Sequence, residues 1–225
     1  MISSTARHEW RIAEREYRRH EARRGRRHAY ETIDARRTAL VVVDMVSFFV
    51  DRSAYVRGII PTVNRVADRL RSAGGTVAWV VPRSGTPTRW ETGFYGDRVA
   101  AMYAGSGGPA EAADRLAPQL AVAGGDAIVE KSSASAFFPG RSTLPQVLER
   151  LGITTVLVAG TVTSVCCEST ARDASTLGYE VILLADATAD VTDDAHNAAL
   201  RTVYRSFGDV RSTADLLDLI ACCMR

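Results

Sequence analysis

The sequence predicts a three-layer α/β/α fold built around a six-stranded parallel sheet. Short, continuous runs of aliphatic and β-branched residues alternate with longer amphipathic segments along most of the chain. That alternation is typical of a parallel sheet with helices on both faces. Glycines follow several of the amphipathic segments, as they do at helix C-termini. The chain has 225 residues, of which 46% are apolar, and this is enough for one domain with a full-sized core.

Composition narrows the class of protein. The formal net charge is only +2, so we expect no nucleic-acid partner. An apolar run of membrane-spanning length is missing from the sequence, and the Arg-rich N-terminus does not read as a secretory signal. The four cysteines form two adjacent pairs, Cys166–Cys167 and Cys222–Cys223. Adjacent cysteines are poor disulfide partners, so we expect a cytoplasmic protein. Because the long apolar run is missing, we expect no membrane contact.

Residues 1–34 are expected to form a helical arm ahead of the main domain, residues 35–225. Nine arginines between Arg7 and Arg27 are interleaved with glutamates. An apolar stripe predicts one helix with a solvated face, and its members are Trp10, Ala13, Tyr17 and His20. We expect the arm to pack on a neighbouring subunit. A basic arm for nucleic acid is the weaker alternative, because acidic residues lie among the arginines.

The first half of the main domain begins with a run of β-branched residues, Thr38–Val43, which predicts a strand buried on both faces. An amphipathic helix follows over Ile59–Ala73, with Pro61 near its first turn, and then a strand over Thr76–Val81. The segment Arg83–Pro109 is long and rich in glycine, proline and aromatic residues. We interpret it as a loop that covers the substrate, since long loops in compact domains are often functional.

The second half continues the alternation of strands and helices. Asp186 is expected to cap a turn, and His196 is expected to be structural because a lone helical histidine is seldom a ligand. The predicted strands are Asp126–Glu130, Thr155–Ala159, Val181–Leu184 and Phe207–Val210, and the predicted helices are Leu144–Leu151, Ser164 to Gly178, Asp193–Phe207 and Thr213–Cys222.

Cys166 and Cys167 follow a predicted strand at the start of a helix. The free N–H groups and partial positive charge of a helix N-terminus favour a thiolate. Cys167 shares a stripe with Ala171 and Ala174 that should pack on the sheet, whereas Cys166 points about 100° away, given ~3.6 residues per turn. Cys166 is therefore the candidate nucleophile and Cys167 a core residue. The alternative is that both are small buried hydrophobes.

Asp44 and Lys131, the only lysine in the chain, also stand at predicted strand ends. Since the carboxyl ends of parallel strands share one edge of the sheet, these two side chains should converge with Cys166. Lys131 would favour the thiolate, and Asp44 would carry a proton between the thiol and a leaving amine. Backbone N–H groups of Val162 and Cys166 would stabilise an oxyanion. The plainer alternatives are a turn cap for Asp44 and a remnant of codon bias for Lys131.

These residues lie in three segments that resemble the isochorismatase-like cysteine hydrolase family. The segments are TALVVVDM with Asp44, VEKSSASAFF with Lys131, and VAGTVTSVCCESTARDASTLGYEVILLADAT with Cys166. The third is similar to the family pattern G-x-x-T-x-x-C-x-x-x-T-x-R-D-A, at Gly160, Thr163, Cys166, Thr170, Arg172, Asp173 and Ala174. The resemblance covers Thr38 to about Leu219.

The resemblance implies an Asp–Lys–Cys triad, a six-stranded parallel sheet of Rossmann-like topology and a cis peptide before Thr163. It also implies a homodimer or homotetramer and no cofactor. Family members cleave amides, ureides or nicotinamide through a thioester, and a few cleave a vinyl ether. Nicotinamidases of the family bind a metal through histidines, but the matching segments here, VDRSAYVRG and VPRSGTPTRW, contain none. We therefore expect no metal.

The favoured function is hydrolysis of a C–N bond in a small amide or ureide through a Cys166 thioester. The wording CESTARD resembles ureidoacrylate and N-carbamoylsarcosine amidohydrolases. One alternative is a vinyl-ether hydrolase with Asp44 as general acid, and another is a catalytically idle binding protein, which the intact triad disfavours. The candidates to wall a substrate pocket are Phe48, Trp90, Tyr95 and Phe137, with core packing as the alternative reading of all four.

Overall fold

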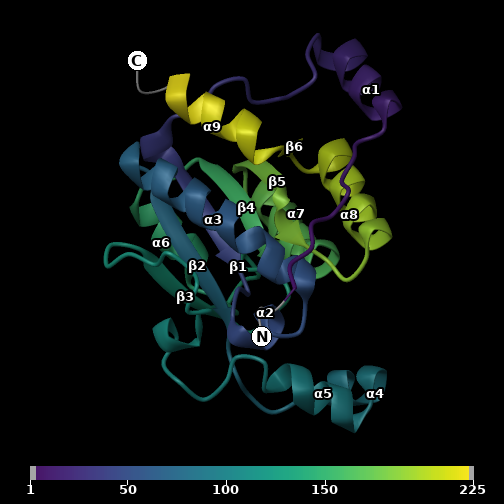
Figure 1. Cartoon of the computed structure of the whole chain (residues 1–225), viewed down its shortest axis with the longest axis vertical. Coiled ribbons are helices and arrows are strands. Elements are labelled where there is room, and N and C mark those ends of the chain that lie inside the picture. Colours follow the sequence, from purple (N-terminus) through teal and green to yellow (C-terminus); the bar gives the residue numbers. More distant parts are fainter. Residues whose placement is uncertain (1–3, 223–225) are drawn as a thin grey trace.

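The computed structural model describes residues 4–222, so Cys223 of the second cysteine pair lies outside the described residues. Within that range, six parallel strands form one sheet in the order β3-β2-β1-β4-β5-β6. Helices cover both of its faces (Figure 1). This confirms the predicted three-layer α/β/α fold. No helix of the described range is long and apolar enough to cross a membrane.

The elements follow one another in the predicted alternation. The strands are β1 (Thr38–Val43), β2 (Thr76–Pro82), β3 (Ala127–Lys131), β4 (Thr155–Thr161), β5 (Glu180–Ala189) and β6 (Asp209–Arg211). The helices are α1 (Glu14–Arg24), α2 (Ser47–Val50), α3 (Ala54–Ser72), α4 (Arg89–Tyr95), α5 (Asp97–Ala104), α6 (Leu144–Arg150), α7 (Glu168–Thr176), α8 (Asp193–Ser206) and α9 (Thr213–Cys222). Short helical turns are η1 (Ala35–Arg37), η2 (Ala113–Arg115) and the π-helical η3 (Thr163–Cys167).

The sheet separates two apolar cores. Leu40 and Val42 of β1 face the core that α3 and α9 cover, while Val41 and Val43 face the core under α6, α7 and α8. Every residue of β1 is buried, as its uninterrupted aliphatic sequence predicted. A central strand this well enclosed is a rigid support for the residue that follows it.

Helix α3 begins earlier than predicted, at Ala54 rather than Ile59. The hydroxyl of Ser53 accepts a hydrogen bond from the Val56 N–H at 3.3 Å and so caps the helix start. Pro61 consequently lies inside the helix and not in its first turn, which corrects the predicted boundary.

The predicted loop Arg83–Pro109 contains two short helices, α4 and α5, which project beyond the body of the molecule (Figure 1). Thr88 and Glu91 form a capping box that starts α4: the Glu91 N–H donates to the Thr88 hydroxyl at 3.2 Å, and the Thr88 N–H donates to Glu91 Oε2 at 2.6 Å. The T-x-x-E spacing of Thr88 and Glu91 is the sequence signal for this helix start. We call residues 89–104 the α4–α5 hairpin.

The N-terminal arm is extended up to Ala13, so its helix begins at Glu14 and not near Trp10. The extended part is held by Asn197 of α8, whose side chain accepts from the Arg11 N–H at 2.7 Å and donates to the Glu9 carbonyl at 2.9 Å. These contacts lie within one chain. Packing of the arm on a neighbouring subunit stays a prediction.

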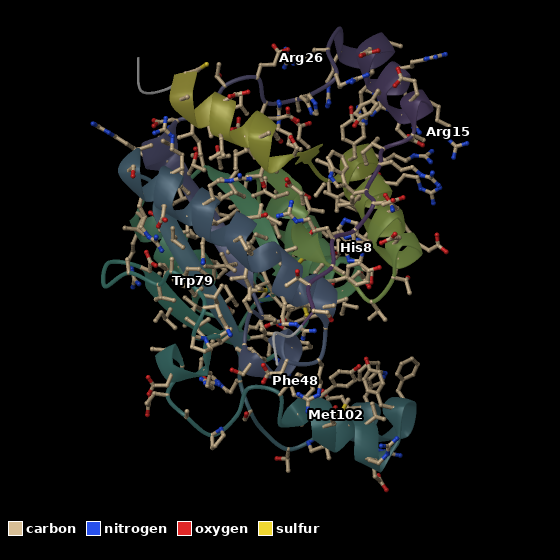
Figure 2. All side chains as sticks on the ribbon, in the orientation of Figure 1. His8, Arg15, Arg26, Phe48, Trp79 and Met102 are labelled. Carbon is tan, nitrogen blue, oxygen red and sulfur yellow. The ribbon has the colours of Figure 1, made fainter. Side chains whose placement is uncertain are left out.

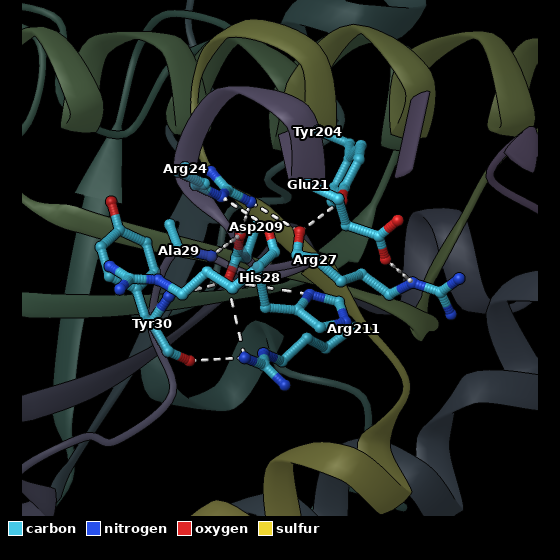
Figure 3. Close-up of polar contacts among 10 residues, drawn as sticks. Glu21, Arg24, Arg27, His28, Ala29, Tyr30, Tyr204, Asp209 and Arg211 are labelled. Atoms are coloured by element: carbon cyan, nitrogen blue, oxygen red, sulfur yellow. Dashed lines mark hydrogen bonds and ion pairs between the residues drawn. The ribbon is translucent and has the colours of Figure 1, made fainter. Parts of the chain in front are cut away.

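A buried carboxylate, Asp209 at the start of β6, fastens the end of the arm (Figure 3). It accepts hydrogen bonds from the N–H groups of Ala29 at 2.8 Å and Tyr30 at 3.1 Å. The Tyr204 hydroxyl of α8 donates to the Arg27 carbonyl at 2.5 Å. Asp209 thus satisfies two backbone donors that would otherwise be buried without acceptors.

Candidate active site

Three polar side chains meet at the carboxyl edge of the sheet, where the strand order reverses between β1 and β4. Such a reversal is where open α/β sheets bind ligands. Asp44 follows β1, Lys131 is the last residue of β3, and Cys166 lies in η3, directly after β4. The side chain of lysine is long enough to reach from β3 across the end of β2 towards β1, since strands lie about 4.8 Å apart.

Lys131 is buried, and its ammonium touches three acceptors. Nζ lies 2.8 Å from Oδ2 of Asp44, 3.0 Å from the carbonyl oxygen of Ser133 and 3.5 Å from Sγ of Cys166. An ammonium has three N–H donors, so these contacts use all of them. Arginine's flat fork does not match acceptors arranged around a point. This geometry gives a structural reason for a lysine here in a chain that otherwise uses arginine.

The backbone of Asp44 is left-handed, with φ 56°. Among residues with a side chain, Asp and Asn adopt this conformation most readily. Oδ2 contacts Lys131, while the buried Oδ1 has no hydrogen-bond partner among the described residues. One buried carboxylate oxygen is thus available to accept a proton.

The two adjacent cysteines have different surroundings. Cys167 is fully buried in the core under α7, and its sulfur lies 4.0 Å from the Ala159 carbonyl. Cys166 is half-buried and its sulfur points to Lys131. The turn that carries both is a π-helical one rather than the first turn of an α-helix, and π-helical turns are frequent at functional sites.

Gly160 lets β4 approach β1 just before this turn. A Cβ at Gly160 would lie 2.1 Å from the Val43 carbonyl oxygen, and its φ of 111° also suits glycine. The cis peptide bond of this region joins Thr161 and Val162, one peptide earlier than the resemblance implied. The Val162 carbonyl accepts from the N–H groups of Val165 and Cys167, each at 3.1 Å.

Burial raises the pKa of the Cys166 thiol to about 12, the Asp44 carboxylate raises this pKa too, and Lys131 lowers it by a smaller amount. Cys166 is therefore protonated at neutral pH in the free protein. Burial lowers the pKa of Lys131, but Asp44 and Cys166 raise it by more, so this side chain stays an ammonium. Lys131 by itself lowers the pKa of the Cys166 thiol, as expected, but burial and Asp44 raise this pKa by more.

Sequence reasoning missed the residues that support η3. The Thr163 hydroxyl lies 2.9 Å from Nδ1 of the buried His196, and the Ser164 N–H donates to Oδ2 of Asp190 at 2.7 Å. The structural role expected of His196 agrees with this burial. Thr163 belongs to the quoted pattern, but nothing in its spacing pointed to a partner 33 residues away.

A second missed support lies in the loop after β3. The hydroxyl of Thr170, in α7, accepts a hydrogen bond from the Ala136 N–H at 3.1 Å, and both groups are buried. The Ser133 hydroxyl donates to the Ser135 carbonyl at 2.8 Å. The loop whose Ser133 carbonyl touches Lys131 is thereby tied to the helix that follows Cys166.

The four aromatic residues suggested for a substrate pocket do not form one wall. Phe48 is half-buried against the core on the α3 side, and the Arg52 guanidinium lies 4.0 Å from its ring centroid. Phe137 is 1% exposed and lies in the opposite core, so its burial fits core packing and not contact with a ligand. Its neighbour Phe138, 51% exposed, is the accessible aromatic of that loop.

Trp90 and Tyr95 do lie together, with ring centroids 5.7 Å apart, in the α4–α5 hairpin. Trp90 is 63% exposed and Phe94 69%. Figure 2 shows Phe48 and Met102 towards the end of the molecule from which the hairpin projects. In the part of the chain that is described, no group of three or more His, Cys, Asp and Glu side chains is arranged to hold a metal ion.

The chain is similar to several known proteins. Residues 38–215 match the model of the isochorismatase domain family. The uncharacterised isochorismatase family protein YwoC of Bacillus subtilis is 31% identical over 84% of this chain and 96% of its own length. The ureidoacrylate amidohydrolase RutB of Stutzerimonas stutzeri is 29% identical over 79% of this chain and 80% of its own. A cysteine hydrolase from Pseudomonas syringae pv. phaseolicola superposes with a TM-score of 0.72 at 27% identity, covering 87% of this chain and 97% of that one.

Proposed function

This chain belongs to the isochorismatase family, and from that premise we propose that it hydrolyses a non-peptide C–N bond in a small amide or ureide through a Cys166 thioester. The observation that carries the proposal is the contact of one ammonium, Lys131 Nζ, with both the Asp44 carboxylate and the Cys166 sulfur. The proton carrier Asp44 and the candidate nucleophile Cys166 are thus both within reach of the Lys131 ammonium. Similarity to an amidohydrolase that acts on ureidoacrylate supports the same class of reaction.

In the first half of the reaction, the Cys166 sulfur attacks the carbonyl carbon as its proton moves to Asp44. Because the resting pKa of this thiol is raised to about 12, the proton leaves together with the attack and not before it. The negative charge passes from sulfur to the carbonyl oxygen, where the N–H groups of Val162 and Cys166 are proposed to stabilise it. Asp44 then gives its proton to the leaving nitrogen, the C–N bond breaks, and a thioester remains.

In the second half, water attacks the thioester carbon and gives a proton to Asp44. The C–S bond breaks, and the sulfur leaves as a thiolate beside the Lys131 ammonium, 3.5 Å away in the free protein. Asp44 returns the proton to sulfur, which restores the starting state. The sum is one water consumed, with a carboxylic or carbamic acid and an amine or ammonia released. The role of Lys131 is to stabilise the transient thiolate, since the resting thiol is neutral.

Intact-protein mass spectrometry after mixing with a panel of small amides and ureides tests this proposal. We expect a mass increase equal to the acyl group, located on the peptide that contains Cys166 and absent from Cys166→Ala. If Cys166→Ala kept its activity while Asp44→Asn lost it, the result would contradict the thioester and point to vinyl-ether hydrolysis with Asp44 as the acid. A folded protein that hydrolyses neither amides and ureides nor vinyl ethers would favour the reading as a binding protein.

We also propose that the α4–α5 hairpin contributes to substrate selection, because it exposes aromatic rings and belongs to the segment that follows the β2 end. Assembly as a homodimer or homotetramer and a cytoplasmic location remain part of the proposal. Light scattering on the purified protein checks the first, and fractionation of the source cells checks the second.

A further inference from the structure

The N-terminal strap, residues 4–12, crosses the start of α3 and then follows α8 (Figure 1). Its Ala6 N–H donates to the Ala54 carbonyl at 3.0 Å, and the Ser4 carbonyl accepts from Nε of Arg57 at 2.9 Å. The strap lies outside residues 38–215, which match the family model. Its contacts therefore join a segment outside the family model to the matched domain.

Gly58 of α3 is buried where the strap crosses it. A Cβ there would lie 1.8 Å from the Ala6 carbonyl oxygen and 2.9 Å from the carbonyl carbon. Both atoms are backbone, so no side-chain rotation relieves the clash. Glycine inside a helix is unfavourable relative to alanine, and the close approach of the strap gives a reason for it at this position.

The side chain of His8 is almost fully enclosed, with 3% of it exposed, and lies beside α8 (Figure 2). Its ring stacks between Tyr55 of α3, with centroids 3.9 Å apart, and His196 of α8, with centroids 4.3 Å apart. Nε2 accepts a hydrogen bond from the Asp190 N–H at 2.9 Å, so Nδ1 carries the hydrogen that points to Oδ1 of Asp193 at 2.6 Å.

Two neighbours of His8 are the residues that hold η3. His196, stacked on His8, lies 2.9 Å from the Thr163 hydroxyl. Asp190, whose N–H binds His8, accepts from the Ser164 N–H at 2.7 Å. A single residue therefore connects His8 to η3 along each of two routes, His196 along one and Asp190 along the other. Both routes end within three positions of Cys166.

We infer that the N-terminal strap positions the Cys166 turn, with His8 acting through His196 and Asp190 as a positioning residue for the reaction. This inference rests on the proposed function. Displacing His8 leaves the Asp190 N–H without its acceptor and removes one face of the His196 stack. The turn then loses the fixed placement of its sulfur and N–H groups, while the groups that would contact substrate remain. A misplacement of about 1 Å in such a site lowers the rate up to about 10²-fold.

The experiment compares three full-length variants with the unchanged protein. Gly58→Ala displaces the strap, and His8 with it, without substituting His8 or any candidate-site residue, and alanine suits the helix. His8→Phe keeps a ring between Tyr55 and His196 but loses both hydrogen bonds. Gly124→Ala is the matched control, because a Cβ at Gly124 meets nothing within 4 Å.

Two readouts are measured for each variant. Steady-state kinetics should give a kcat lower by about 10- to 100-fold in Gly58→Ala and His8→Phe, with KM within about threefold. Hydrogen–deuterium exchange should become faster in peptides covering residues 160–170 but not in those covering β1. Gly124→Ala should leave both readouts unchanged.

The two readouts separate the inference from the function on which it rests. Faster exchange at residues 160–170 in a protein that hydrolyses no amide or ureide would support the strap and overturn the proposed function. Unchanged exchange and unchanged kcat in Gly58→Ala and His8→Phe, in an active hydrolase, would overturn the inference that the strap positions the Cys166 turn. A general loss of protection across the sheet, or a rise in KM alone, would also contradict it.

Discussion

Two segments at the carboxyl edge of the sheet are held in opposite ways. The Cys166 turn, η3, follows β4 and is bound to α8 through His196 and to the end of β5 through Asp190. The α4–α5 hairpin follows β2, and its first helix, α4, has no buried residue anywhere in its described length. The hairpin's rings pack mainly on one another, as Trp90 does on Phe94 at 5.3 Å.

The comparison teaches where precision is required. Atoms that react must be fixed to within a fraction of an ångström, and buried polar bonds do this. The surface that we propose to select the substrate needs accessible apolar area, which an exposed cluster of rings supplies. Substitutions in the first segment should therefore change kcat, and substitutions in the second should change KM.

The largest expected effect lies in the Cys166 turn. Cys166→Ala should lower kcat/KM by at least about 10³-fold, because no nucleophile remains. Asp44→Asn should do the same, since asparagine tolerates the left-handed backbone at this position but cannot take a proton. Kinetics with the preferred amide or ureide measure both.

Cys167→Ala is the matched control for the nucleophile. It removes the neighbouring sulfur from the core and should keep kcat within about twofold, with about 1 kcal/mol of stability lost. Equal inactivation of both cysteine variants would mean that the turn is damaged by any substitution, and the distinction between the two cysteines would fail.

Alkylation of Cys166 should be slow at neutral pH. Only the thiolate reacts, and a thiol pKa of about 12 leaves little thiolate at pH 7. We expect iodoacetamide to modify Cys166 at least about 10-fold more slowly than a cysteine peptide, with a rate that keeps rising above pH 9. Asp44→Asn should speed the reaction, because the Asp44 charge raises this pKa. A rate that levels off near pH 7 would show a thiolate already formed.

The support of the Cys166 turn should be sensitive to acid because it includes His196. The α4–α5 hairpin, residues 89–104, contains no histidine, so we expect no such effect from a histidine there. Burial lowers the pKa of His196 from 6.5 to about 4, and the neighbouring His8 lowers it too, while Asp190 and Asp193 oppose the shift. Between these values the unfolded chain binds the proton and the folded one does not. Folding therefore loses up to about 3 kcal/mol as pH falls from 6.5 towards 4.

Urea unfolding at pH 7 and pH 4.5 measures this loss. His196→Gln, which has no group that titrates in this range, should lose less stability between the two pH values than the unchanged protein. An identical loss in both would assign the acid sensitivity to other groups.

The smallest expected effect lies in the hairpin. Trp90→Ala and Phe94→Ala should change the free energy of unfolding by less than about 0.5 kcal/mol, since both rings are exposed. We expect KM to rise by up to about 10-fold and kcat to stay within about twofold. Trp90→Phe keeps a ring and should behave like the unchanged protein. A fall in kcat with constant KM would show that the hairpin affects the same kinetic constant as the Cys166 turn, which would contradict the contrast between the two segments.

Local sequence determined the sheet and the convergence at its edge. The aliphatic run Thr38–Val43 could be buried only between two helical layers, and β1 has these bounds. Asp44, Lys131 and Cys166 follow strand ends that a parallel sheet brings to one edge. Asp186 was expected to cap, and its carboxylate accepts from the Thr213 N–H at 2.7 Å at the start of α9. The strand β1 and the convergence at the sheet edge depend on neighbours in the chain or on one topological rule, whereas the helix start that Asp186 caps lies 27 residues further along the chain.

Tertiary structure alone decided which groups surround those residues. The raised pKa of Cys166 depends on its burial, and the burial of Phe137 depends on which core its loop enters. The strap reaches its partners across the chain, since His8 lies 185 residues from Asp193. Local patterns carry no information over such separations, because the contact exists only after the sheet brings the starts of α3 and α8 together. Sequence therefore predicted the groups that we propose to react, while the folded packing set their surroundings and their supports.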